Sequence, residues 1–184
     1  VLSGDEKKDR DMSCAQVFDK NTYEQVAVWY GNVAPDLLGQ ELDKLGRYYN
    51  RALIGVERNA VGVTTLIKLR DVGYTNLYYS EKFGTMVDRP SSELGWVTTP
   101  ASKELIISEA TELLRGSHVI INDEGTVSEM RSFVRNIDGK AGAARGRHDD
   151  MVMSALIALK MLQKAKSSTN SNQISSGENL TDQG

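Results

Sequence analysis

The sequence predicts an α/β domain in which a mixed sheet is covered by helices on both faces. Two observations carry this prediction. Strand-like segments rich in Val, Phe and Trp come first, and amphipathic segments then alternate with short apolar runs. Such alternation is typical of a sheet packed between layers of helices. We expect the domain to occupy residues 1–165, and residues 166–184 to form a flexible polar tail because they contain almost nothing apolar to bury.

The first strands are expected to form a hairpin. The opening residues VLSG are typical of the last part of a buried strand, so we expect the rest of that strand to precede residue 1. The segments 13–18 and 24–29 are rich in strand-forming residues, and the four polar residues 19–22 lie between them.

Two helices and two short strands are expected next. Pro35 suits the first turn of a helix, and leucines spaced by three and four extend this helix to about residue 50. The continuous apolar run 52–56 is typical of a strand buried on both faces. A second helix is expected over about 60–70, with its end at Gly73, and a short strand over 77–79.

The second half of the chain begins with a less regular segment. Residues 80–99 have no clear period, so a loop with one short strand near Trp96 is expected. Thr99 and Pro100 then predict a helix start, with an N-cap hydroxyl followed by proline. The expected buried stripe of this helix is Leu105, Ile106, Ala110, Leu113 and Leu114.

The remaining elements are a strand over 119–121, a short helix, a hairpin and a final helix. Thr126 and Glu129 have the spacing of a capping box at the start of the short helix. Asp138 and Gly139 fit a hairpin turn. The last helix is expected to run from His148 to about residue 164.

Composition restricts the class of protein. Apolar residues make up 40% and charged residues 26% of the chain, as in globular proteins. There is no apolar run of the ~20 residues that span a bilayer and no signal-peptide pattern. The single cysteine, Cys14, cannot form an internal disulfide, which fits a reducing compartment. A net charge of −3 argues against a strong free-standing nucleic-acid binder, but a carboxylate site becomes electropositive once metal fills it.

Three acidic segments contain the candidate catalytic residues. Asp5 follows the apolar start, Glu57 follows the buried run, and the pair Asp149 and Asp150 opens the last helix. Because ligands of α/β proteins gather at the carboxyl ends of strands, we expect these acids to converge at one edge of the sheet. Two divalent cations held ~3.5–4 Å apart by carboxylates can activate water and stabilise the leaving oxygen of a phosphodiester. The pattern therefore predicts a two-metal nuclease.

Each acid also has an ordinary interpretation. Asp5 lies among other charged residues, as in a solvated loop. Acids at the start of a helix satisfy free N–H groups and the helix dipole, so one of Asp149 and Asp150 is expected to cap the helix while the other faces the sheet edge. Asn59 either orients Glu57 or caps the next helix.

Five blocks follow one another along the chain: GDEKKDRDMSCAQVFD, LIGVERNAVG, GYTNLYY, LGWVTTPASKELI and DGKAGAARGRHDDMVMSALIAL. By their order and spacing, the chain resembles the C-terminal nuclease domain of the large terminase subunit of tailed bacteriophages. The resemblance covers nearly everything from residue 4 to about residue 162. It implies a ribonuclease H-like fold, related to the resolvases, and two-metal cleavage of concatemeric DNA during genome packaging.

The resemblance also implies roles for particular residues. Asp5 corresponds to the first metal ligand and Glu57 to the second, while Asp149 or Asp150 corresponds to the third, with Asp150 favoured. Asp11 resembles a further acid that follows the first ligand. Two Mg²⁺ or Mn²⁺ ions are the implied cofactors. If the first ligand precedes residue 1, Asp5 is only a loop acid.

The implied partners are double-stranded DNA, the portal protein, the small terminase subunit and a packaging ATPase domain. The implied location is the cytoplasm of the infected bacterial host, without secretion or membrane association. No GxxxxGK[ST] phosphate loop occurs in the sequence, so we expect the ATPase on another part or another chain. Lys140, Arg145 and Arg147 precede the acidic pair, and we hypothesise that they contact DNA phosphates, with a solvated loop as the alternative.

Two other functions remain open at this point. A resolvase- or transposase-type nuclease would use the same chemistry on a different substrate. A nuclease-dead docking domain would use its acids only to cap helices. Of the other candidate residues, His148 could act as an acid or base, and Trp29 and Trp96 are expected to pack in the core.

Overall fold

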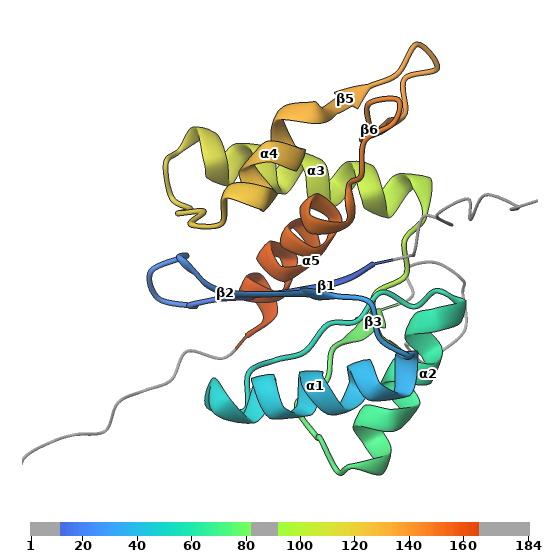
Figure 1. Ribbon diagram of the computed structural model, residues 1–184. Helices are drawn as coiled ribbons and strands as arrows, with labels where there is room; N and C mark the ends of the chain where they lie inside the picture. The colour runs from blue at the N-terminus through green and yellow to red at the C-terminus, as the bar shows by residue number, and fades with distance from the viewer. Residues whose placement is uncertain (1–11, 82–91, 166–184) are drawn as a thin grey trace, which may run out of the picture.

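The structure, a computed structural model, describes residues 12–81 and 92–165 (Figure 1). The expected opening strand, the expected tail, Asp5 and Asp11 lie outside these residues. In chain order the elements are β1 (Ser13–Phe18), β2 (Gln25–Gly31), α1 (Pro35–Tyr48), α2 (Ala60–Asp71), β3 (Tyr79–Glu81), β4 (Ser92–Leu94), α3 (Pro100–Arg115), α4 (Glu124–Ser132), β5 (Phe133–Arg135), β6 (Ala141–Ala143) and α5 (Asp150–Lys164).

Helices lie on both sides of the β1–β2 hairpin. Figure 1 shows α1 and α2 below the hairpin and α5 above it, with α3 and α4 farther out on the α5 side. Each side has its own cluster of buried apolar residues, one around α5 and one around α1 and α2. An α/β fold with helices on both sides of the hairpin is therefore confirmed, whereas the expected mixed central sheet stays a prediction.

The described strands form three two-stranded antiparallel sheets. In the expected hairpin, β1 pairs with β2 from Ser13 opposite Gly31 to Phe18 opposite Gln25. Its turn is stabilised by Asp19, whose carboxylate accepts hydrogen bonds from the backbone N–H groups of Asn21 and Thr22 at 2.7 and 2.9 Å.

The short apolar runs expected as strands pair less extensively. Single parallel bridges join Ile54 to Leu77, Glu57 to Trp96, and Glu24 to Ile120. Two backbone hydrogen bonds flank the first bridge, from Ile54 N to the Asn76 carbonyl at 3.0 Å and from Tyr78 N to the Ile54 carbonyl at 2.9 Å. The chain thus brings the end of the 52–56 run beside Trp96, which positions Glu57.

The helices begin where local sequence signals place them, with one correction. Thr99 caps α3 in a reciprocal capping box with Ser102. The capping box expected between Thr126 and Glu129 is wrong, because α4 starts earlier. Its N-cap is Asp123, whose carboxylate accepts a hydrogen bond from Thr126 N at 2.6 Å. Glu129 is left for a different partner.

The stripe expected on α3 is narrower in the structure. Ile106 and Ala110 are buried, whereas Leu105 and Leu114 are 50% and 40% exposed. The reason is that α3 packs on α5 along one side, which leaves Leu105 and Leu114 partly exposed to solvent.

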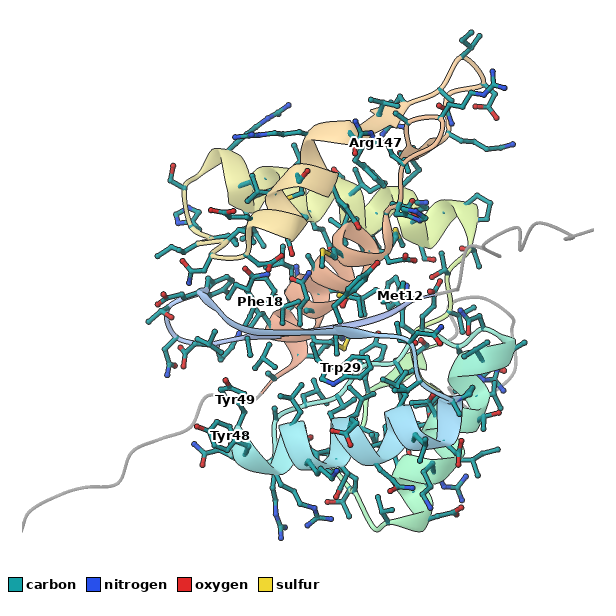
Figure 2. All side chains as sticks on the ribbon, in the orientation of Figure 1. Met12, Phe18, Trp29, Tyr48, Tyr49 and Arg147 are labelled. Atoms are coloured by element: carbon teal, nitrogen blue, oxygen red, sulfur yellow. The ribbon has the colours of Figure 1, made fainter. Side chains whose placement is uncertain are left out.

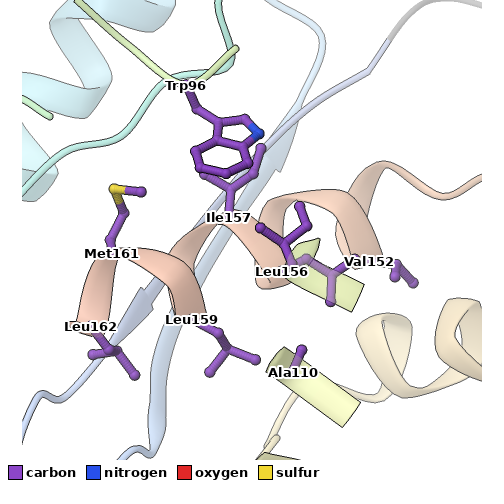
Figure 3. Close-up of a cluster of buried hydrophobic side chains, with 9 residues drawn as sticks. Trp96, Ala110, Val152, Leu156, Ile157, Leu159, Met161 and Leu162 are labelled. Atoms are coloured by element: carbon purple, nitrogen blue, oxygen red, sulfur yellow. The ribbon is translucent and has the colours of Figure 1, made fainter. Parts of the chain in front are cut away.

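The larger core is built on α5 (Figure 3). Ile157 and Met161 point toward Trp96, and Leu159 points toward Ala110 of α3. On the other side of the hairpin, Trp29 packs against the core of α1 and α2 (Figure 2). Both tryptophans therefore pack in the core, as expected. Within the described ranges, no helix combines the length and the apolar character needed to cross a membrane.

Candidate functional site

The predicted acids that the structure describes lie along one cavity. Glu57, Asp149 and Asp150 all line it, together with Met12 at the start of β1 and Lys103 of α3. All three carboxylate residues are half-buried. Residues almost a hundred positions apart in the sequence thus line the same cavity, and their predicted convergence on one metal site stays a prediction.

Two of the predicted acids cannot be placed in this cavity. Asp5 and Asp11 lie outside the described residues. Asp11 is, however, the direct sequence neighbour of Met12, which lines the cavity. The start of β1 therefore leads to the same place as Glu57 and the acidic pair.

Glu57 is held at the junction between an extended segment and α2. On one side, Trp96 N donates to the Val56 carbonyl at 2.8 Å, and Arg58 N donates to the Trp96 carbonyl at 2.6 Å. On the other side, Asn59 caps α2 by accepting a hydrogen bond from Gly62 N at 2.8 Å. Of the two roles considered for Asn59, the structure shows capping.

The acidic pair lies at the start of α5, but Asp149 does not cap it. Asp149 is the N-cap residue and its side chain makes no capping hydrogen bond. Instead, the Glu129 carboxylate of α4 accepts hydrogen bonds from Met151 N at 2.8 Å and Val152 N at 3.2 Å. One of the two aspartates was expected to cap the helix, but Asp149 does not. Glu129, a residue of α4, caps α5 instead.

Two observations indicate how the two aspartates are directed. Lys103 Nζ lies 3.6 Å from Asp149 Oδ2, so Asp149 faces the first turn of α3. Burial raises the pKa of the Cys14 thiol to about 11, and the nearby charges of Glu129 and Asp150 add to that increase. Asp150 is therefore close enough to β1 to act electrostatically on Cys14.

The chemistry of these groups suits a divalent cation. Carboxylate oxygens are the ligands that Mg²⁺ and Mn²⁺ prefer. Within residues 12–81 and 92–165, no three acidic, histidine or cysteine side chains lie close enough together to hold a metal ion. Glu57, Asp149 and Asp150 therefore line one cavity, but among the described residues they do not form a group of three that could hold an ion, and their role as metal ligands stays a prediction.

The predicted DNA-binding residues lie on and next to the β5–β6 hairpin. Lys140 follows its turn and pairs with Asp138 at 3.1 Å, and both side chains are exposed. Arg145 and Arg147 are exposed on the segment between β6 and α5. Figure 1 shows the hairpin extending beyond α3 and α4, and Figure 2 shows Arg147 near its base. The three cations thus lie on an exposed surface that leads to Asp149.

His148 and two further residues complete the surroundings. His148 is exposed and lines the cavity, so its position is compatible with the proton transfer considered for it. Sequence reasoning missed Lys103, which carried no signal beyond its place in the first turn of α3. It also missed the role of Glu129, because the spacing from Thr126 suggested a local capping box.

Comparison with solved structures adds information on the fold. The large terminase nuclease from thermophilic phage G20c, crystallised with bound magnesium, matches with a TM-score of 0.65 and 22% identity, over 82% of this chain and 75% of that chain. This chain has the fold of a large terminase nuclease. A second crystal structure of the same phage nuclease matches with a TM-score of 0.62 and 23% identity, over 83% of this chain and 76% of that chain.

The terminase nuclease fold accounts for most of the chain, although no protein-family model matches the sequence. The terminase nuclease fold expected from the sequence resemblance is therefore confirmed, whereas the ribonuclease H-like arrangement of its sheet stays a prediction. At this level of identity the similarity concerns the fold, so the chemistry of this chain is argued from its own residues.

Proposed function

We propose that this chain is the metal-dependent DNA endonuclease domain of a phage terminase. In this proposal it cuts concatemeric double-stranded DNA during genome packaging, on a ribonuclease H-like fold. One observation carries the proposal: Glu57 and the pair Asp149 and Asp150, far apart in sequence, line one cavity in a chain with the terminase nuclease fold. The magnesium bound to the phage G20c nuclease supports the same class of ion here.

The proposed ligands are Glu57, Asp149 and Asp150, completed by Asp5 or by an acid before residue 1, with Asp11 as a weaker candidate. Two Mg²⁺ or Mn²⁺ ions, when bound, would supply an activated water and stabilise the departing 3′ oxygen. The described carboxylates are half-buried, which favours cation binding because their charge is less screened by solvent than on an open surface.

Lys103 is proposed to contact first Asp149 and then the DNA. It balances the charge of Asp149 at 3.6 Å while no divalent ion is present. Once cations neutralise the carboxylates, its ammonium is available for a DNA phosphate at the edge of the cavity. Lys140, Arg145 and Arg147 would extend this contact along the DNA backbone.

The wider setting of the activity belongs to the same proposal. The fold is that of terminase nucleases, so we propose the portal protein, the small terminase subunit and a packaging ATPase domain as partners. The proposed place of action is the cytoplasm of the infected bacterial host, where concatemeric phage DNA accumulates.

Two substitutions test the nuclease proposal. Glu57→Ala and Asp150→Ala each remove a proposed ligand from a half-buried position, so both should abolish cleavage of plasmid DNA with Mn²⁺. Circular dichroism should show that both variants remain folded. Glu93→Ala is the control, because this nearby carboxylate pairs with Arg58 at 2.9 Å and is not a proposed ligand.

The outcomes separate the proposal from its rivals. Variants that still cut DNA as the unaltered chain does would refute it. Selective cutting of branched junctions over linear duplex would favour a resolvase-type nuclease. If titration calorimetry detects no binding of Mn²⁺ to the unaltered chain, a nuclease-dead docking domain becomes the better interpretation.

A further inference from the structure

The first turn of α5 is held by a residue from α4. The first four N–H groups of a helix have no acceptor within the helix. In α5, two of them, Met151 N and Val152 N, donate to Glu129 Oε2 at 2.8 and 3.2 Å. Asp149, the residue placed to accept such bonds, makes none with its side chain. The cap therefore comes from 22 positions away in the sequence.

A second set of hydrogen bonds holds the same turn against the hairpin. Gln16 of β1 donates through Nε2 to the Met151 carbonyl at 2.9 Å and to Thr126 Oγ1 at 3.0 Å. The Gln16 side chain in turn accepts from Gln25 of β2 at 2.8 Å. Gln25 and Thr126 are 2% and 0% exposed. Buried networks with satisfied partners are rigid, so α4, α5 and the hairpin are fixed relative to one another here.

Close packing of α4 on the same turn restricts it further. A Cβ added at Gly125 would lie 2.9 Å from Met151 Sδ and 3.1 Å from Met151 Cε. The first turn of α4 thus approaches α5 so closely that only a residue without a side chain leaves Met151 in place. This contact is with the flexible end of the Met151 side chain, so it keeps α4 close to α5 without fixing the helix by itself.

We propose that Glu129 is a positioning residue for the carboxylates of Asp149 and Asp150. By accepting the free N–H groups of α5, Glu129 leaves Asp149 available to a cation in the cavity. This inference rests on the proposed function. Without Glu129 the two N–H groups have no protein acceptor, and Asp149 is the nearest carboxylate in the sequence able to accept them. Capping would then turn the Asp149 side chain from the cavity toward its own helix.

The test compares three variants of the full 184-residue chain. Glu129→Ala removes the cap, and Glu129→Gln retains an oxygen acceptor. The matched control is Glu109→Ala, which also removes a glutamate that contacts α5. The Glu109 carboxylate binds Lys160 at 2.7 Å, toward the other end of the helix. The three readouts are thermal unfolding, amide hydrogen exchange at Met151 and Val152, and the Mn²⁺ concentration that gives half-maximal cleavage.

We expect Glu129→Ala to raise the half-maximal Mn²⁺ concentration by roughly 10- to 100-fold, the usual effect of losing a group that orients a metal ligand. Cleavage should recover at high Mn²⁺. Exchange at residues 151 and 152 should become faster. Glu129→Gln should restore most of the metal affinity, while Glu109→Ala should lower the melting temperature without changing the Mn²⁺ dependence.

Two results would overturn the inference. One is an unchanged Mn²⁺ dependence in Glu129→Ala while the unaltered chain requires Mn²⁺. The other is an equal loss of metal affinity in Glu109→Ala, since a general loosening of α5 would then explain both. If the unaltered chain neither binds nor needs a divalent ion, the proposed function itself fails and the assigned role fails with it. Faster exchange at residues 151 and 152 would then still identify Glu129 as a structural cap.

Discussion

Gly62→Ala should displace Glu57 without altering any proposed ligand. A Cβ at residue 62 would overlap the carbonyl oxygen of Glu57 and lie 3.0 Å from its carbonyl carbon. Both are main-chain atoms, so no change of side-chain rotamer can relieve the overlap. The turn between residues 57 and 62 has to open, and the hydrogen bond from Gly62 N to Asn59 Oδ1 weakens with it.

The expected cost follows from two opposing effects. Overpacking costs about 1–3 kcal/mol, and weakening an N-cap costs about 1 kcal/mol more. Alanine in place of glycine inside a helix returns up to about 1 kcal/mol. The net loss of about 2 kcal/mol corresponds to a fall of roughly 4–8 °C in the melting temperature of a domain of this size. A displacement of about 1 Å at Glu57 should lower the rate of DNA cleavage about 100-fold.

Calorimetry and plasmid cleavage at saturating Mn²⁺ measure the two effects separately. Gly39→Ala is the control, because its Cβ would lie 2.7 Å from Lys68 Cβ and 2.9 Å from the Thr65 carbonyl, where α1 crosses α2. It should cost similar stability and leave cleavage largely intact. Equal activity in the two variants, at equal loss of stability, would refute the argument that the turn at Gly62 positions Glu57.

Two further predictions concern charge. Replacing Lys140, Arg145 and Arg147 with Ala should weaken DNA binding. The slope of log affinity against log salt concentration should fall by up to ~3, because each lost phosphate contact removes about 0.9. An unchanged slope would leave a solvated loop as the better interpretation of this segment. Because burial raises the pKa of Cys14 from 9.0 to about 11, its alkylation at pH 8 should be ~100-fold slower in the folded chain than in urea. The raised pKa also means that the protonated thiol contributes up to ~3 kcal/mol to the free energy of unfolding. This contribution is complete below pH 9 and is lost as pH rises through about 11. Urea titrations of the unaltered chain and of Cys14→Ala over this pH range measure the contribution, and parallel curves of stability against pH would contradict it.

The elements that could be predicted from the sequence are those with local causes. Pro35 and Thr99 mark helix starts through their own backbone and hydroxyl chemistry, and the structure has α1 and α3 beginning there. The hairpin turn at Asp138 and Gly139 is local in the same way, since Gly139 has a φ of 79°. Such signals need no knowledge of the rest of the fold.

Contacts between distant segments could not be predicted. Thr126 and Glu129 match the spacing of a capping box. However, the N-cap is Asp123, three residues before Thr126, and its carboxylate accepts the hydrogen bond from Thr126 N. Glu129 then bonds to residues 22 and 23 positions later, and no local pattern records that pairing. The contact of Lys103 with Asp149 likewise depends on how α3 packs beside the start of α5.

The strands show the same limit. The run 52–56 is apolar enough to be buried, and it is indeed extended beside Leu77 and Trp96. Its pairing is restricted to single bridges because strand length depends on the partner segments as much as on the run itself. The position of Glu57 at its end was nevertheless predictable, because it depends only on where the apolar run stops.

The charges along the cavity connect metal binding to DNA binding. Glu57, Asp149 and Asp150 line it, and of the basic residues in its lining Lys103 lies 3.6 Å from Asp149. Without divalent ions, these three carboxylates repel a phosphate that approaches them. Divalent ions on the carboxylates reverse the sign of the local potential, because the ions become the largest charges in the site. On the proposed function, cation and DNA therefore assist one another's binding, and a chain with an overall charge of −3 needs no extended basic surface to hold its substrate at the cut.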